Sequence, residues 1–119
     1  MSKFVAVGHN GLRVTSADGV AWDKPQVGKE GETYRAVAYG NGVFVAVGQN
    51  RALVSPDGIN WTEHLVAQAA FSGITFGDGK FLGVGFMNRR ITSVDGMSWS
   101  QAVTDGGPVL ISAAWGPGE

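Results

Sequence analysis

Three short polar segments carry most of the side chains that could bind a ligand. Each contains an asparagine, and in two of them an arginine follows directly. Amides donate and accept hydrogen bonds and guanidinium groups pair with carboxylates, so these residues could bind a polar or anionic small molecule such as a sugar. The alternative is that asparagine stands here because it tolerates the positive φ of a turn. The candidate ligand-binding residues are His9, Asn10, Asn50, Arg51, Asn88 and Arg89.

Few other residues are placed for catalysis or metal binding. The sequence has two histidines, His9 and His64, so a metal site would need a second chain or carboxylates without an evident pattern. It contains no P-loop, no dinucleotide-binding glycine motif before a helix and no nucleophile-elbow motif. We therefore expect no metal, no cofactor and no catalytic residue. Glu30, Glu32 and His64 are weaker candidates for ligand contact, because they fall in variable loops.

A seven-residue pattern, S-x-D-G-x-x-W, occurs three times, with tryptophans 39 and 38 residues apart. This period is typical of repeat architectures. In a turn, the aspartate can accept hydrogen bonds from the backbone N–H groups ahead of it, and the glycine can take the left-handed conformation. The serine hydroxyl can hold the other side of the hairpin, and the tryptophan can bury its ring between repeats. We therefore assign a structural role to the box residues, which are Ser16, Asp18, Gly19, Trp22, Ser55, Asp57, Gly58, Trp61, Ser93, Asp95, Gly96 and Trp99.

Short apolar segments accompany each box in a constant order, and each is too brief for a helix and rich in strand formers. Two inner segments end in Asn-Gly or Asp-Gly pairs, which favour a tight hairpin to the segment that follows. The repeat is therefore four antiparallel strands whose two faces are both apolar, as a sheet packed between similar sheets requires. The inner segments are residues 34–40, 71–77 and 110–116; those of the second strand are 4–8, 44–48 and 81–85; those of the third are 12–15, 52–54 and 90–92.

The three boxes resemble the Asp-box, or BNR-type, repeats of β-propellers such as sialidases. The resemblance covers essentially the whole chain, although the common form S-x-D-x-G-x-x-W has one more residue between aspartate and glycine. It implies an all-β propeller with four-stranded antiparallel blades and three blade equivalents in the chain. It also implies that the boxes lie away from the face that carries a sialidase active site, so they say little about function.

The order of strands leaves the repeat unfinished at both ends. We expect one repeat domain over residues 1–119, with the outer three strands of a blade at 3–28, complete blades at 34–66 and 71–104, and an inner strand at 109–115 that completes a blade in trans. Two chains would give six blades, within the range of known propellers. The expected partner is therefore a second copy, joined by strand exchange between residues 109–115 and 4–8 into a homodimer. The rival expectation is that the chain is half of a longer propeller.

Two function classes remain open. A sialidase-like hydrolase would need an arginine triad, a tyrosine nucleophile and an acid/base aspartate, and no spacing of the five arginines with Tyr34 and Tyr39 suggests these roles. We therefore predict no enzyme activity and favour a binding scaffold for a glycan or other small polar ligand at the axial loop face. The alternative is a fragment or relative of a sialidase-like glycoside hydrolase.

Charge and composition narrow the partners and the compartment. A net charge of −1 and a pI near 6.1 argue against nucleic acid or an anionic membrane as the main partner. The absence of cysteine excludes disulfides and thiolate metal sites. The first residues form too short an apolar run for a signal peptide, so the default expectation is a cytoplasmic protein, with the compartment open if the chain is part of a longer one.

Overall fold

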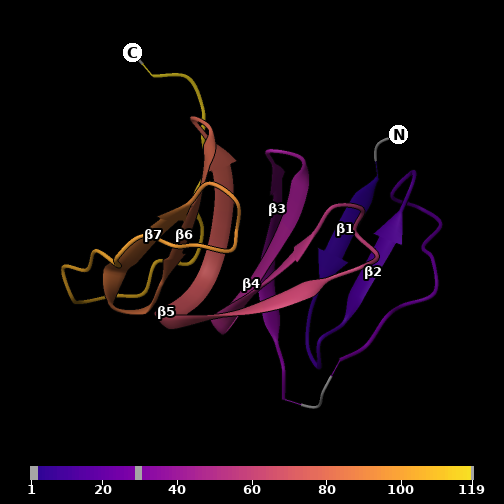
Figure 1. The fold of residues 1–119 in the computed structure, drawn as a ribbon, viewed down its shortest axis with the longest axis horizontal. Coiled ribbons are helices and arrows are strands. Elements are labelled where there is room, and N and C mark those ends of the chain that lie inside the picture. Colours follow the sequence, from indigo (N-terminus) through magenta and orange to yellow (C-terminus); the bar gives the residue numbers. More distant parts are fainter. Residues whose placement is uncertain (1–2, 29–30, 119) are drawn as a thin grey trace.

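A computed structural model describes residues 3–28 and 31–118 and is all-β. Figure 1 shows three groups of strands that follow one another along the chain. Within the described residues, the longest helix is η1, a 3-10 turn at Phe86–Asn88. The strands are β1 (Phe4–Val7), β2 (Arg13–Ser16), β3 (Tyr34–Gly40), β4 (Val43–Ser55), β5 (Thr62–Gly77), β6 (Lys80–Gly85) and β7 (Arg89–Ser93).

All strand pairing is antiparallel. Strands β1 and β2 form a two-stranded sheet, and the other strands form a five-stranded sheet in the order β3-β4-β5-β6-β7. The first half of β4 pairs with β3 and its second half with the first half of β5, whose second half pairs with β6. Strand β5 therefore passes from the second repeat unit (residues 34–66) to the third (71–104), while β1 and β2 belong to the first unit (3–28).

Two hairpins repeat the same turn. In the β3–β4 hairpin, Asn41 has φ 49° and Gly42 has φ 83°, and in the β5–β6 hairpin Asp78 has φ 51° and Gly79 has φ 76°. Two consecutive positive φ values are what a two-residue hairpin needs to match the twist of its strands, and Asn-Gly and Asp-Gly supply them at low cost. This two-residue turn thereby fixes the register of both hairpins.

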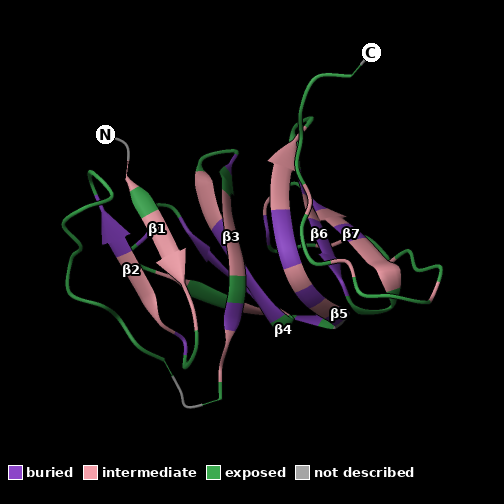
Figure 2. Ribbon diagram, turned by 180° about the vertical axis from the view of Figure 1, so that it is seen from behind, coloured by how far each residue is buried: buried purple, intermediate pink, exposed green. Residues whose placement is uncertain are grey.

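The core lies between the second and third units, as the purple segments of β4, β5 and β6 show in Figure 2. Its largest members include Phe71 and Phe81, which are 2% and 0% exposed. A second cluster of Tyr34, Ala46 and Leu53 is buried on another face of the second unit. Because these strands are covered on both faces, their sequences do not alternate between apolar and polar residues.

The segment predicted as an inner strand, residues 109–115, forms no strand in the part of the chain that the structure describes. It nevertheless lies along the second half of β5, as Figures 1 and 2 show. Gly73 lies against the backbone of Ile111, and Gly77 lies under the indole of Trp115. A strand needs a hydrogen-bonded ladder. The segment has one such bond, from the Leu110 N–H to the Gly85 carbonyl at 3.0 Å.

Candidate functional site

The three boxes share one hydrogen-bond pattern. In the second box, Asp57 Oδ1 accepts bonds from the N–H groups of Ile59 and Asn60, both at 2.8 Å, and Ser55 Oγ accepts one from the Gly58 N–H at 2.7 Å. The equivalent bonds recur in the first and third boxes. The three box glycines have φ between 78° and 80°. These contacts close the turn on itself, and this geometry supports a structural role for the box.

The bonds to backbone N–H groups also change the acidity of the box aspartates. The pKa of Asp57 falls well below its ordinary value of 3.8, because the N–H groups of Asn60 and Ile59 stabilise the ionised carboxylate. The pKa values of Asp18 and Asp95 are lowered for the same reason. Each box thus holds a permanently ionised carboxylate at neutral pH, whose charge is satisfied inside its own turn.

The box tryptophans differ between units. The indole N–H groups of Trp61 and Trp99 donate to the carbonyl of their own box glycine at 3.2 and 3.0 Å, and both rings are half-buried. Trp99 also packs against Phe71 with ring centroids 5.0 Å apart. Trp22 is 46% exposed. Its unit contributes only the strands β1 and β2 to the described sheets, so fewer side chains surround it.

The three asparagines of the predicted ligand site all adopt left-handed backbone conformations. Asn10, Asn50 and Asn88 have φ values of 56°, 58° and 59°. Each therefore has a backbone reason to be asparagine, independent of any ligand. Asn10 is also engaged in its own unit, because its carbonyl accepts the Gly28 N–H at 2.9 Å and its side-chain oxygen accepts the Gly31 N–H at 3.2 Å.

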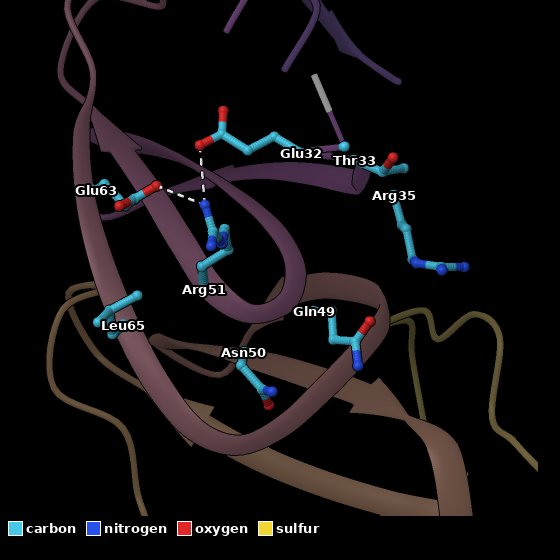
Figure 3. Close-up of a pocket in the computed structure, with 9 residues that line it drawn as sticks. Glu32, Thr33, Arg35, Gln49, Asn50, Arg51, Glu63 and Leu65 are labelled. Atoms are coloured by element: carbon cyan, nitrogen blue, oxygen red, sulfur yellow. Dashed lines mark hydrogen bonds and ion pairs between the residues drawn. The ribbon is translucent and has the colours of Figure 1, made fainter. Parts of the chain in front are cut away.

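Two of the predicted ligand residues, Asn50 and Arg51, line a hollow of about 650 Å³. Figure 3 shows the side chains that line it, which come from the chain before β3, the start of β3, the bend of β4 and the first half of β5. We call it the Arg51 hollow. Its described lining is Gly31, Glu32, Thr33, Arg35, Gln49, Asn50, Arg51, Glu63 and Leu65.

Arg51 is fixed in this hollow by two carboxylates. Its Nη1 lies 2.9 Å from Glu32 Oε2 and 3.0 Å from Glu63 Oε2, as the dashed lines in Figure 3 mark. Burial raises the pKa of the neighbouring Tyr34, and the carboxylates of Glu32 and Glu63 raise it further. The two carboxylates more than compensate the charge of Arg51, which therefore acts as a positioned hydrogen-bond donor more than as an anion receptor.

Arg35 is the cation of the hollow that a ligand could reach. Its side chain is exposed and points away from the Arg51 cluster in Figure 3. The guanidinium carbon lies 5.9 Å from the ring centroid of Phe86, and no carboxylate of the described residues pairs with it. Arg35 also lines a second hollow, of about 510 Å³, whose other lining residues include His9, Ser72, Phe86, Val109 and Ile111. It therefore stands between the two hollows.

The six predicted ligand residues are distributed among different surfaces. Asn50 and Arg51 share the Arg51 hollow, His9 lines the second hollow, and Arg89 lies beside a small apolar crevice near Ile91. Of the weaker candidates, Glu32 is in the Arg51 hollow, His64 lies on β5 opposite Ala52, and Glu30 falls outside the described residues. No group of three or more potential metal ligands occurs among the residues described.

Sequence reasoning missed Arg35 and Glu63. The signal for Glu63 was available in the box, because a hairpin centred on residue 58 places Leu65 opposite Arg51 and hence Glu63 on the diagonal. Diagonal neighbours on one face of an antiparallel pair are within reach of long side chains. Arg35 carries no such signal, because it falls at the register shift between Tyr34 and Ala36, where the pairing of β3 with β4 is irregular.

Comparison with known proteins identifies the class as a β-propeller. A solved structure titled "YCF48 bound to D1 peptide", of a β-propeller protein, superimposes on the chain with a TM-score of 0.72. The two are 19% identical, and the match covers 90% of this chain and 39% of that one. The chain thus spans about two fifths of that protein. No protein-family model and no curated protein matches the chain. No described helix is long and apolar enough to cross a membrane.

Proposed function

We propose that the chain is a non-enzymatic binding scaffold that takes a polar ligand in the Arg51 hollow. We further propose that two copies exchange strands to close a six-bladed propeller. The observation that carries the binding proposal is the fixed Arg51–Glu32–Glu63 cluster in one hollow of about 650 Å³, beside Arg35, which forms no ion pair within residues 3–28 and 31–118. Fixed polar groups at the wall of a concave site orient a ligand without a reorganisation cost.

The chemistry of the lining favours a peptide segment with a carboxylate. Gln49 and Asn50 offer amide groups that match the hydrogen-bonding groups of a peptide backbone, and Leu65, 77% exposed, offers apolar contact. Arg35 is free to pair with a carboxylate of the ligand. None of the described lining residues is aromatic, so a sugar ring would lack a stacking partner. The structural neighbour is titled as bound to a peptide, which agrees with this choice.

The positions of Tyr34, Tyr39 and Arg51, the candidate residues for hydrolysis, favour binding over hydrolysis. A tyrosine nucleophile must lose its proton readily, yet burial raises the pKa of Tyr34. Tyr39 lies four residues further along β3 from Arg35, about 13 Å at the usual rise of a strand. Arg51 is already paired with two carboxylates of its own chain. A substrate carboxylate would have to compete with both.

The test is binding of two pools of fluorescently labelled synthetic hexapeptides, one with Asp and Glu at varied positions and one with Asn and Gln in their place. We expect the acidic pool to bind more tightly, and Arg35→Gln to remove most of this difference. Arg89→Gln is the matched control, because Arg89 lies outside the Arg51 hollow, and it should bind like the unmodified chain. Equal binding of both pools would refute the proposal.

Two parallel assays distinguish the sequence-based alternatives. Binding on a glycan array without peptide binding would favour the glycan ligand. Release of product from a fluorogenic sialoside, lost in Arg51→Ala, would establish the hydrolase instead.

A further inference from the structure

An aromatic pair recurs at one position of the two complete hairpins. Tyr39 on β3 faces Phe44 on β4 with ring centroids 4.7 Å apart, and Phe76 on β5 faces Phe81 on β6 at 4.9 Å. By repeat position the third pair is Trp115 with Phe4. These two rings are 64% and 56% exposed. The chain therefore carries both halves of a third pair that it does not form.

A contact between inner segments also recurs. Gly40 lies under the ring of Phe76, and Gly77 lies under the ring of Trp115, so closely in both cases that only glycine fits. The next glycine in this series is Gly116, and no described residue covers it. By the same series, the ring that should cover Gly116 belongs to the residue at the Tyr39 position of the next unit. Tyr39 itself is 55% exposed, so it covers no such glycine among the described residues of its own chain.

The box glycines show a missing contact of the same kind at the start of the chain. Gly58 packs on Val5 of the preceding unit, and Gly96 packs on Val45, which holds the same place in its hairpin. Both glycines are buried, whereas Gly19 in the first box is exposed. The residue at the position of Val5 and Val45 in the third unit is Leu82, opposite Thr75. Gly19 would therefore pack on Leu82 of a unit that precedes it.

Residues 110–115 already lie where the inner strand of a further unit would lie. The Leu110 N–H donates to the Gly85 carbonyl at 3.0 Å, just as the Tyr34 N–H donates to the Gly8 carbonyl at 3.1 Å where the second unit follows the first. Residues 110–115 thus have the place of the next inner strand against the third unit. Their outer edge lacks a strand in the described chain, and β1 pairs only with β2, so each end offers a free edge.

From these contacts we infer that residues 110–115 of one copy pair with β1 of a second copy in one register, with Trp115 opposite Phe4 and Ala113 opposite Ala6. This register rests on the two-chain propeller proposed above. In it, Tyr39 of the second copy covers Gly116, and the first box of the second copy packs on Leu82. The contacts are reciprocal, so the assembly closes after two copies and has twofold symmetry.

Pro117 argues against a direct tight hairpin from residues 110–116 into a following strand. In both complete hairpins the residue between the two turn glycines has positive φ, 49° at Asn41 and 51° at Asp78. Pro117 stands at that position in Gly116-Pro117-Gly118. Proline is held near φ −65°, so the tight hairpin that joins inner and second strands elsewhere cannot form here. The second strand must therefore arrive from another chain or by a longer connection.

The absence of cysteine in the chain allows a direct test of the register. Two single variants, Ala6→Cys and Ala113→Cys, are mixed, unfolded and refolded together, and oxidised. Opposed residues in an antiparallel pair have Cβ atoms about 4.5–5.5 Å apart, close enough for a disulfide. We expect a disulfide-linked pair of chains from the mixture and almost none from either variant alone. Ala6→Cys mixed with Ile111→Cys is the control, because residue 111 lies two residues away from the position opposite Ala6.

The native mass is measured on the unmodified chain without ligand. A mass of twice 12.4 kDa supports the assembly, and the 12.4 kDa of a single chain overturns it, with a longer parent chain or a different protein then the occupant of the free edges. A dimer that links Ala6 to Ile111 as readily as to Ala113 overturns the register but not the two-chain propeller. Neither result depends on peptide binding, so the two proposals fail separately.

Discussion

Ser55 is the most deeply buried polar side chain of the second box, with no exposed surface. Its hydroxyl accepts the Gly58 N–H and donates to Asp57 Oδ1 at 3.0 Å. Ser55→Ala should therefore leave a buried N–H without a partner and destabilise the protein by about 1–3 kcal/mol. Urea unfolding measures this loss. Ser98→Ala, at an exposed box position, should change stability little, and an equal loss in both variants would contradict the assigned role.

Asp57 makes the stability of the box depend on pH. Its pKa is lower in the folded chain than the ordinary value of 3.8, because backbone N–H groups stabilise the carboxylate. The carboxylate's contribution is therefore complete above that ordinary value and is lost as the pH falls below it, toward the folded pKa. We expect the midpoint of thermal unfolding to drop as the pH is lowered from about 5 to about 2.

The matched variant for this pH dependence is Asp57→Asn. The amide oxygen can still accept the N–H groups of Ile59 and Asn60, but it does not titrate. The variant should therefore lose less stability than the unmodified chain over the same acid range. Asp18 and Asp95 keep part of the effect, so the slope is reduced and not abolished. An unchanged slope would show that Asp57 does not contribute.

At the scale of elements, Gly40 tests how closely the units pack. It is buried under the Phe76 ring at the end of β3, and its backbone conformation is ordinary, so only space excludes a side chain. Gly40→Ala should push β3 away from β5 at a cost of about 1–3 kcal/mol. Gly42→Ala is the comparison, because Gly42 has open space and positive φ and so reports backbone strain alone. Chemical denaturation of both variants separates the two causes.

The sequence predicts these elements well where a local rule applies. The Asn-Gly and Asp-Gly pairs place the hairpins at residues 41–42 and 78–79, and the boxes fix the turns between them. In the structure, the second and third strands of the second unit form one continuous strand, β4. The fourth strand of that unit continues into the inner strand of the third unit as β5. Asn50 has positive φ inside β4, and an asparagine with positive φ gives the same sequence signal in a bend within a strand as in a turn between two strands. The Arg51 hollow was only half predictable. Glu32 reaches it from the chain before β3, whose course no local rule fixes, and Arg35 reaches it from the register shift at the start of β3.

At the scale of the whole molecule, several aromatic side chains are exposed at repeat positions. Phe4, Trp22, Tyr39 and Trp115 are each at least 46% exposed. Phe81, the counterpart of Phe4, is buried, and the counterparts of the others, Phe76, Trp61 and Trp99, are half-buried. Exposed aromatic residues at repeat positions that are covered elsewhere indicate missing neighbours more than a tolerant surface. If a second copy supplies these neighbours, folding and association are one reaction. The midpoint of thermal unfolding should then rise with protein concentration.

A tandem fusion tests this coupling. One copy ending at residue 118 is followed directly by a second copy starting at Lys3, so that Gly116-Pro117-Gly118-Lys3-Phe4 takes the place that Gly77-Asp78-Gly79-Lys80-Phe81 has in the β5–β6 hairpin. With Pro117→Asp at the junction, the positive φ of the tight turn becomes accessible. We expect a monomeric fusion whose unfolding midpoint no longer depends on concentration, measured by scanning calorimetry over a range of dilutions. The same fusion with Pro117 retained is the control, and it should be less stable or associate further. If the Asp fusion still forms dimers, or if the single copy already unfolds independently of concentration, the free edges at residues 4–7 and 110–115 do not belong to one another.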